Sequence, residues 1–436
     1  MPGIHVIGSG SVGLLVAWHL RHMKIPVTLL MRNAEAATAI VAAGGVQLEY
    51  QGDPAAAEEW LSGHASPPRH AVAVETATPG GGWHALGVGS GGGSSSRGGP
   101  ITQLVVATKA ADTVPALLSV SSRLSPAANV LLLQNGALGV FPEVHARAVA
   151  PGHTPAGLQL SIGSVTHGAY RRGPDHVVQS CMGAIKLAPA DPGLADLADA
   201  KHQSVWPRLG LMGLLGGRVR TLEQQQSAIA GGSLLRRLIA VRGLNAELVP
   251  SHAELMQQVH RKLAINCAVN AGTALLGVFN CEYTQSAWGR RLVHDVCVEL
   301  FGIFGPQLLG FERADELAEY VLQVASGTGR NKNSMLQDVE AGRPTEVDYL
   351  NGYVVTHARA LGLDAPVNSL LHALIKAKEA AASRGQAAVE AWEQDAMRSA
   401  PVDSLMHALI RAKEEAAMRE RSTAGEEAAP AGREGA

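Results

Sequence analysis

The sequence predicts an α/β protein in which an N-terminal doubly wound parallel sheet is followed by a mostly α-helical C-terminal domain. In the first third of the chain, short apolar runs alternate with helix-compatible segments, which is typical of a parallel sheet with crossover helices. From about Ser251 the apolar residues recur at helical spacing with few breakers. A chain of 436 residues is long enough for two or three domains.

The first forty residues are predicted to form a strand, a turn, a helix and a second strand. Ile4–Ile7 is a short apolar run, Leu14–Met23 can continue as a helix, and Pro26–Met31 is a second buried-strand candidate. Further strand candidates are Gln103–Ala107 and Asn129–Leu133. This alternation predicts strands that lie parallel in one sheet.

A glycine-rich motif occupies the turn after the first strand. Its residues, all expected to contact a dinucleotide, are Gly8, Ser9, Gly10, Ser11, Val12 and Gly13. Gly8 allows the tight turn, Gly10 lets a pyrophosphate approach the backbone, and Gly13 permits close packing of helix on strand. Because the motif follows a strand and opens a helix, it predicts a Rossmann-type domain that binds a dinucleotide. A glycine-rich turn without a ligand is the alternative.

The end of the second strand predicts which dinucleotide binds. NAD-binding versions of this domain carry an acidic residue about 20 residues beyond the glycines, which holds the ribose 2′-hydroxyl. Here the strand ends in Arg32-Asn33. A guanidinium can pair with a 2′-phosphate that a carboxylate would repel. We therefore predict NADPH as the cofactor, and an exposed surface arginine is the alternative.

Polar residues follow the next two predicted strands. Lys109 comes just after Gln103–Ala107, and Asn135 comes just after Asn129–Leu133. Because the carboxyl ends of the strands face the ligand crevice in such sheets, we expect both side chains to contact the nucleotide. Either residue alone would more often be an ordinary loop residue, but two polar residues at consecutive strand ends favour a functional role.

We divide the chain into a nucleotide-binding domain over 1–250, a helical substrate and catalytic domain over 251–385, and a tail over 386–436. Glycine and serine dominate residues 76–100, which predicts a disordered insertion. In the tail, Pro401–Glu414 repeats Pro366–Glu379 almost residue for residue. Only one copy can occupy a given groove, so we expect the second copy to lie loosely on the surface and the tail to be partly disordered.

The helix that begins near Ala253 carries a polar stripe. Lys262, Asn266 and Asn270 are spaced at i, i+4 and i+8, which places them on one face. A solvent-facing polar stripe is one interpretation, and the apolar residues between them fit a cleft equally well. A lysine against an apolar wall has a lowered pKa and can donate a proton near neutrality.

Glu346 follows Gly342 and Pro344, which places it at the start of a predicted helix. It is a candidate for the site, although a carboxylate there is also favoured simply by the helix dipole. The histidines form no H-x-x-x-H pair or acid-rich cluster, so we expect no metal.

The charge composition of the chain argues against two kinds of partner, nucleic acids and membrane surfaces. Acidic and basic residues number 38 and 36, which gives a net charge of −2. A nucleic-acid platform or a membrane-surface binder needs clustered positive charge, so we expect neither partner. No run approaches the roughly 18 consecutive apolar residues of a membrane span. The four cysteines form no C-x-x-C pair and no leader precedes Ile4, so we expect a cytoplasmic location.

Together these motifs resemble the ketopantoate reductase (2-dehydropantoate 2-reductase) family over most of residues 3–50, 101–187 and 233–380. Besides the glycine motif, the resemblance rests on Thr108-Lys109-Ala110, Gln134-Asn135-Gly136, Thr166-His167-Gly168, Lys262-x-x-x-Asn266-x-x-x-Asn270, Ser334–Asp338 and Thr345–Gly352. The resemblance puts the family's catalytic lysine on Lys262 and its catalytic glutamate on Glu346. It implies nucleotide contacts at Arg32, Lys109 and Asn135, and substrate contacts at Asn266, Asn270, Asn280, Asn331 and Ser334.

The resemblance implies NADPH-dependent reduction of a small 2-oxo acid, 2-dehydropantoate, to (R)-pantoate in pantothenate and coenzyme A biosynthesis. Lys262 would protonate the forming alkoxide, and Glu346 would orient a substrate hydroxyl and help hold Lys262. Two alternatives stay open, a reductase of another branched 2-oxo acid and a regulatory protein that binds NADPH without turnover. The sequence does not fix the oligomeric state, and a homodimer is compatible with it.

Overall fold

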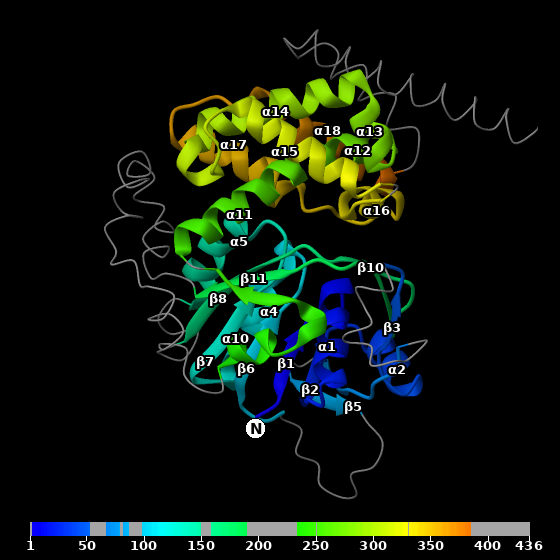
Figure 1. Cartoon of the computed structure of the whole chain (residues 1–436). Helices are drawn as coiled ribbons and strands as arrows, with labels where there is room; N and C mark the ends of the chain where they lie inside the picture. The colour runs from blue at the N-terminus through cyan, green and yellow to red at the C-terminus, as the bar shows by residue number, and fades with distance from the viewer. Residues whose placement is uncertain are drawn as a thin grey trace, which may run out of the picture. The chain divides into compact units, whose positions relative to one another are not determined.

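The computed structural model describes residues 2–52, 67–78, 82–86, 98–149, 158–189, 233–249, 251–329 and 331–384. The chain divides into two compact units, Met1–Met256 and Gln257–Ala436. The division falls inside the helix His252–Ile265 (α11), rather than at residue 250, where the sequence pattern placed it. The first unit holds the strands, and the second is helical (Figure 1).

In its described part, the first unit is built on a nine-stranded sheet of order β12-β11-β8-β7-β6-β1-β2-β4-β5. The strands of this sheet are Ile4–Ile7 (β1), Val27–Met31 (β2), Ala73–Ala77 (β4), Trp83–Leu86 (β5), Ile101–Val106 (β6), Leu124–Leu132 (β7), Gln159–Val165 (β8), Ile185–Pro189 (β11) and Ala246–Leu248 (β12). The central series β4-β2-β1-β6-β7-β8 pairs in parallel throughout. The strand order reverses at β1, and a ligand crevice forms at such a switch point, outside the carboxyl ends of the strands. The predicted fold class is confirmed.

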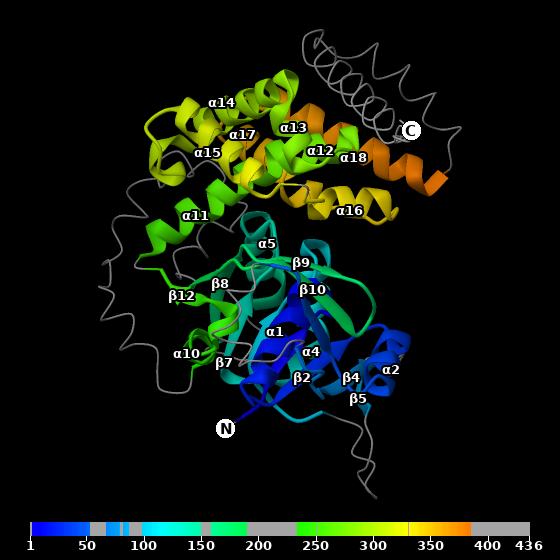
Figure 2. The same ribbon diagram turned by 45° about the vertical axis from the view of Figure 1, so that its right-hand side comes forward.

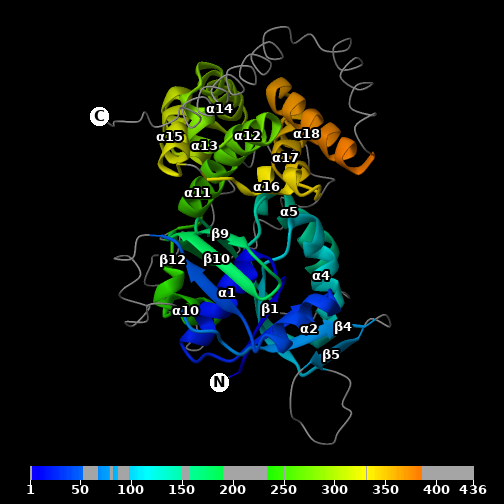
Figure 3. The ribbon, with the colours of Figure 1, turned by 90° about the vertical axis from the view of Figure 1, so that its right-hand side faces the viewer.

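Helices cover this sheet, and Ser11–His22 (α1) is enclosed between it and a second, smaller sheet. Besides α1, the helices are Ala34–Ala42 (α2), Thr113–Val120 (α4), Ala137–Val144 (α5) and Leu234–Ile239 (α10). A second sheet, of order β3-β10-β9, is made of Gln47–Tyr50 (β3), Gly168–Arg171 (β9) and His176–Cys181 (β10). Strands β9 and β10 pack on α1 (Figure 3), so every residue of α1 from Gly13 to Leu20 is buried.

Part of the segment 76–100 is ordered, and the prediction of a disordered insertion is wrong there. Strand β5 pairs antiparallel with β4 in an edge hairpin. Trp83 of β5 is 3% exposed, and its Nε1 donates to the Ser119 carbonyl at 3.1 Å. The burial of Trp83 and the pairing of β5 with β4 both favour an ordered strand within this glycine-rich stretch. Residues 79–81 and 87–97 lie outside the described part of the chain.

The second unit is helical, as predicted. Besides α11, its α-helices are Ala271–Leu276 (α12), Asn280–Gln285 (α13), Ala287–Leu309 (α14), Ala314–Gly327 (α15), Ser334–Glu340 (α16), Asn351–Ala360 (α17) and Pro366–Arg384 (α18). Among the described helices, α14 alone is long and apolar enough to cross a membrane by length and composition. In this unit it is a core helix that packs on α13, α15 and α18, with Val293, Val296 and Leu300 buried.

Helix α18 is the first copy of the sequence repeat, and it packs on α12, α16 and α17 (Figure 2). Glu299 of α14 caps its N-terminus, because the carboxylate accepts the backbone N–H of Val367 at 2.7 Å and of Asn368 at 2.9 Å. The side-chain Nδ2 of Asn368 donates to the same carboxylate at 2.7 Å. Asp403 stands at the corresponding position of the second copy, and the predicted tail 386–436 lies outside the described residues.

Candidate active site

The three glycines of the nucleotide motif have three different surroundings. Gly8 has a φ of +108°, and a Cβ there would lie 2.6 Å from the carbonyl oxygen of Ala107. A Cβ at Gly13 would overlap the carbonyl oxygen of Gly8. At Gly10 the nearest atom would be 3.8 Å away, so this face of the turn is open. The geometry fits a tight turn at Gly8 and close packing of helix on strand at Gly13, and the approach of a ligand to Gly10 stays a prediction.

Helix α1 begins directly at this open face. Gly10 is its N-cap and supplies no capping side chain, so the N–H groups of the first turn point to the space that a ligand would take. This twelve-residue helix has no acidic side chain in its first turn that would compete with an anion.

The predicted basic residues lie just beyond the carboxyl ends of neighbouring strands. Arg32 follows β2, and its Nη2 lies 2.8 Å from Oδ1 of Asp112. Lys109 follows β6 and is the N-cap of the 3₁₀ turn that contains Asp112. Both side chains of the Arg32–Asp112 pair are largely exposed, at 56% and 41%, so the pair contributes little to stability and the guanidinium can exchange partners.

Asn135 follows β7 and precedes Gly136, whose φ of +66° opens α5. Beside it, Gln134 is 6% exposed, and neither its Oε1 nor its Nε2 has a partner in the described part of the protein. A buried amide without a partner is costly, so Gln134 is suited to a polar group supplied by a ligand. With the open face at Gly10, this amide makes the residues of the unit a good fit for a nicotinamide dinucleotide.

In the second unit, the predicted polar stripe runs along one continuous helical rod. Asn270 Nδ2 donates to Asn266 Oδ1 at 3.0 Å, and both side chains are 7% exposed, so neither faces open solvent. The rod is not uniformly α-helical, because residues Asn266–Asn270 form a π-helical turn between α11 and α12. Such turns are rare and are frequently found at functional sites.

The π-helical turn is stabilised from outside the rod. Asn351 Nδ2 donates to the carbonyl of Cys267 at 3.2 Å, and the Tyr283 hydroxyl donates to the carbonyl of Ala268 at 3.1 Å. A Cβ at Gly272 would collide with the Tyr283 ring, so this glycine permits the contact. The two donors add hydrogen bonds to these carbonyls from outside the rod.

Lys262, the first residue of the stripe, lies one turn before the π-helical turn and is electrostatically coupled to Glu346. Burial lowers the pKa of Lys262 to about 8, and the negative charge of Glu346 acts in the opposite direction. Glu346 directly precedes the 3₁₀ turn Val347–Tyr349, and the α-helix α17 begins only at Asn351. An ammonium group with a pKa of about 8 is suited to donate a proton at neutral pH.

Of the other predicted substrate residues, Asn280 opens α13, whereas Asn331 and Ser334 lie where the chain enters α16. Asn280 is 5% exposed; its Nδ2 donates to Thr328 Oγ1 at 2.8 Å, and its Oδ1 accepts from Asn333 Nδ2 at 3.0 Å. The carbonyl of Asn331 accepts the backbone N–H of Asn280 at 3.4 Å. Ser334 is exposed as the first residue of α16. In this structure, Asn280 therefore anchors the segment that carries Asn331 and Ser334.

Two models of protein families match this chain. The model described as "Ketopantoate reductase PanE/ApbA" matches residues 4–192, and "Ketopantoate reductase PanE/ApbA C terminal" matches residues 254–379. The chain belongs to the ketopantoate reductase family. The two matches cover both units, including the glycine motif, Lys262 and Glu346.

Known ketopantoate reductases are similar to this chain over different lengths. A 2-dehydropantoate 2-reductase from Salmonella typhi is 39% identical over 129 residues, which are 29% of this chain and 41% of that relative, so the match spans about two fifths of it. The 2-dehydropantoate 2-reductase from Yersinia pestis is 26% identical over 280 residues, 63% of this chain and 74% of that relative. A PanE/ApbA family ketopantoate reductase from Ralstonia eutropha shares the fold at a TM-score of 0.60 with 20% identity, covering 88% of this chain and 100% of that one.

Sequence reasoning missed two residues that contact the predicted site residues or the segments that carry them. Arg171 of β9 donates from Nη1 to the Ser9 carbonyl at 2.8 Å, which brings a guanidinium to the glycine turn. Asn333 is the N-cap of α16, and its Nδ2 donates to Thr273 Oγ1 at 2.6 Å. The Asn333 cap could have been recognised as an asparagine before an apolar helical run. No local signal marked Arg171, because its contact with Ser9 spans 162 positions.

Proposed function

We propose that this protein reduces 2-dehydropantoate to (R)-pantoate with NADPH, the activity named for the relatives above. The observation that carries the proposal is the coupling of Lys262 to Glu346 beside the buried Asn266–Asn270 pair. A 2-oxo acid reductase needs a proton donor with a pKa near neutrality, and it needs polar groups that fix the substrate against an apolar wall.

The residues of the second unit can perform the proton transfer. The ketone carbon of the substrate would receive the hydride that NADPH supplies when bound. Lys262 donates a hydrogen bond to the ketone oxygen and then transfers its proton to that oxygen as the C–O π bond breaks, so one proton is consumed for each alcohol formed. Glu346 accepts a hydrogen bond from the substrate hydroxyl and stabilises the ammonium form of Lys262. Asn266, Asn270 and Ser334 hold the remaining polar groups of the substrate.

The residues of the first unit supply the groups that would hold NADPH. The open face at Gly10 and the N-terminus of α1 suit the pyrophosphate, and Arg32 suits the 2′-phosphate. Lys109, Asn135 and Gln134 lie along the same edge of the sheet. In the bound state the 2′-phosphate would replace or share the contact that Arg32 makes with Asp112.

We further propose that the enzyme works in the cytoplasm, in the supply of pantoate for coenzyme A. All four cysteines, which include the buried Cys267 and Cys297, are free thiols, and free thiols suit a reducing compartment.

The proposal is tested by following the absorbance of reduced nicotinamide with 2-dehydropantoate, comparing NADPH with NADH. We expect turnover with NADPH, and we expect Lys262→Ala to lower it by roughly 10²-fold or more, the magnitude of general acid catalysis. A parallel assay with 2-oxo-3-methylbutanoate, which lacks the hydroxyl, should give a lower kcat/KM. Equal rates on both acids would favour the broader branched 2-oxo acid reductase, and NADPH binding without any oxidation would favour a regulatory protein.

A further inference from the structure

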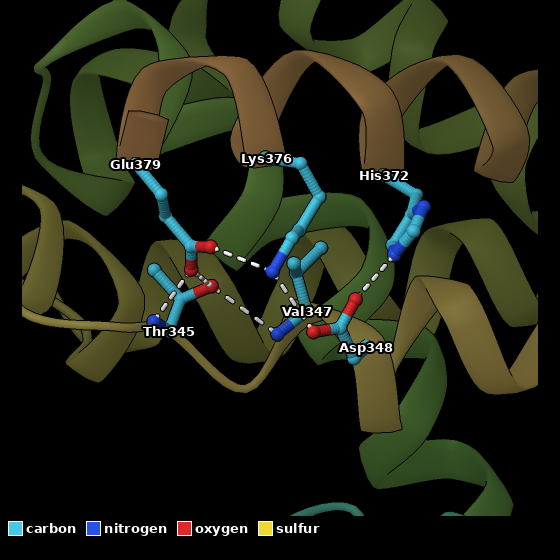
Figure 4. Close-up of polar contacts among 6 residues, drawn as sticks. All are labelled: Thr345, Val347, Asp348, His372, Lys376 and Glu379. Atoms are coloured by element: carbon cyan, nitrogen blue, oxygen red, sulfur yellow. Dashed lines mark hydrogen bonds and ion pairs between the residues drawn. The ribbon is translucent and has the colours of Figure 1, made fainter. Parts of the chain in front are cut away.

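The segment that carries Glu346 is held on one side by Glu379 of α18 (Figure 4). The Glu379 carboxylate accepts both the backbone N–H and the hydroxyl of Thr345, each at 2.6 Å. The Thr345 hydroxyl in turn accepts the backbone N–H of Val347 at 3.2 Å. The residue immediately before Glu346 is therefore fixed by a bifurcated, charge-assisted contact.

The same helix holds the segment on the other side of Glu346. Asp348 lies between His372, whose Nε2 is 2.6 Å from Oδ1, and Lys376, whose Nζ donates to Oδ2 at 3.0 Å. Lys376 Nζ also lies 2.9 Å from Oε2 of Glu379. This ion pair joins the contacts of Glu379 with Thr345 and those of Asp348 into one network. His372, Lys376 and Glu379 are spaced at i, i+4 and i+7, so they share one face of α18 (Figure 4).

We propose that this face of α18, formed by His372, Lys376 and Glu379, positions Glu346 for its interaction with Lys262. These are positioning residues, since they act on the residues that flank Glu346. The inference rests on the proposed function in that Lys262 and Glu346 carry out the proton chemistry.

The segment that carries Glu346 depends on these polar contacts for its position. A cavity of about 330 Å³ lies beside the network and is lined by Pro344, Lys376 and Glu379 among others, so packing alone does not fix the segment on that side. On the other side, a Cβ at Gly352 would lie 3.1 Å from Nε2 of His372, so this glycine lets α17 approach the imidazole closely.

The contacts of the network act on the pKa values of Asp348 and Lys376. Partial burial acts to raise the pKa of Asp348, but the hydrogen bonds from His372 and Lys376 outweigh it and the pKa is lowered. Burial acts to lower the pKa of Lys376, and Glu379 and Asp348 outweigh that effect, so this pKa is raised.

The sequence repeat offers a natural set of substitutions at this face. The second copy has His407, Arg411 and Glu414 at the positions of His372, Lys376 and Glu379, so its only change at these three positions is the conservative exchange of lysine for arginine. An arginine at 376 keeps the positive charge between two carboxylates.

The experiment measures kcat, KM and the pH dependence of turnover for Glu379→Gln, Lys376→Met and Lys376→Arg in the full chain. We expect the first two to lower kcat about tenfold, because small displacements of a reacting group are costly, and to leave the KM for NADPH unchanged. We also expect the loss of activity at alkaline pH to move to lower pH, since a displaced Glu346 no longer supports the ammonium form of Lys262. Lys376→Arg should retain wild-type behaviour.

Lys378→Gln is the matched control. Lys378 is also on α18, but its Nζ donates to the carbonyls of Ala274 and Leu275, each at 2.8 Å, at the end of α12. Its loss should lower the melting temperature without moving the pH profile. An unchanged profile in Glu379→Gln, or an equal shift in Lys378→Gln, would overturn the positioning role.

A second readout separates this inference from the proposed function. The pKa of Lys262 can be measured without substrate, from the pH dependence of its acetylation rate followed by mass spectrometry. If the wild type reduced no 2-oxo acid but Glu379→Gln still lowered this pKa, the proposed activity would be wrong and the positioning role would stand. If the wild type were active and the variant left the pKa unchanged, the positioning role would be wrong.

Discussion

Lys262 and Glu346 lie 84 positions apart in the sequence and are electrostatically coupled within the C-terminal unit. The lysine extends from α11, one turn before a π-helical turn, and the glutamate precedes a 3₁₀ turn that α18 holds in place. Burial and the carboxylate act in opposite directions on the pKa of the lysine, and the result is about 8.

The first prediction concerns the pH dependence of turnover. Lys262 donates its proton only as the ammonium ion, so reduction should proceed below about pH 8 and be lost as the pH rises through that value. Glu346→Gln removes the charge that raises this pKa, so the decline should begin at lower pH, together with a lower kcat. The measurement is the pH profile of kcat for both proteins. An unshifted profile in Glu346→Gln would mean that the charge of Glu346 does not affect proton donation by Lys262.

The second prediction distinguishes two arginines of the nucleotide-binding unit. Arg32→Gln should weaken NADPH binding about tenfold or more and leave NADH binding nearly unchanged, because only NADPH carries the 2′-phosphate. Arg171→Gln should weaken both equally, since it donates to the Ser9 carbonyl beside the expected pyrophosphate position. Titration calorimetry with both nucleotides measures the ratio of the dissociation constants for NADPH and NADH in each variant. Arg172→Gln is the control, because Arg172 pairs with Glu49 of β3. Loss of the preference for NADPH over NADH in Arg171→Gln would mean that Arg171, and not Arg32, contacts the 2′-phosphate.

The third prediction concerns stability in acid. His19 is 1% exposed and lies 3.1 Å from Gln179 Oε1, and burial lowers its pKa from 6.5 to about 3 although the Gln179 contact opposes this. Between these two values the unfolded chain binds a proton that the folded chain does not. The stabilisation is therefore complete above pH 6.5 and is lost as the pH falls, by up to about 1.4 kcal/mol per pH unit. Urea unfolding at pH 7.5 and at pH 5 should show a smaller loss for His19→Asn than for the wild type.

The fourth prediction concerns the cap of α18. Asn368→Asp would put a second carboxylate against Glu299, so we expect the free energy of unfolding to fall by about 2–4 kcal/mol at pH 8. Part of this loss should be recovered at pH 5, where one of the two carboxylates binds a proton. Asn368→Ala, which adds no charge, should show a loss that does not depend on pH. Identical pH dependence in the two variants would mean that Glu299 does not sense the charge.

The parts of the fold that sequence predicted correctly are those with local causes. Strands β1 and β2 are apolar runs bounded by turn residues, and the glycine motif lies between a strand and a helix, which is the local context it requires. The small sheet has no such local cause, because Gln47 of β3 pairs with His176 of β10 across more than a hundred residues.

In the candidate site too, the features with local causes were predictable from the sequence, and those that depend on distant residues were not. The stripe of Lys262, Asn266 and Asn270 followed from helical spacing. The π-helical turn could not be predicted, because it depends on donors from Asn351 and Tyr283, which are distant in sequence. The contacts around Glu346 were also unpredictable, since α18 meets that segment only in the folded unit.

The hydrogen bond from Asn368 to Glu299 has a consequence for the duplication of this sequence within one chain. The copies share a proline, a histidine, a basic residue and a glutamate at matching positions, but they differ where Glu299 makes its contact, with Asn368 in one and Asp403 in the other. An asparagine at this position offers Glu299 a hydrogen-bond donor, whereas an aspartate would offer it a second negative charge. Hydrolytic loss of ammonia from Asn368 would therefore turn an attraction at the start of α18 into a repulsion, without any change in the rest of the sequence.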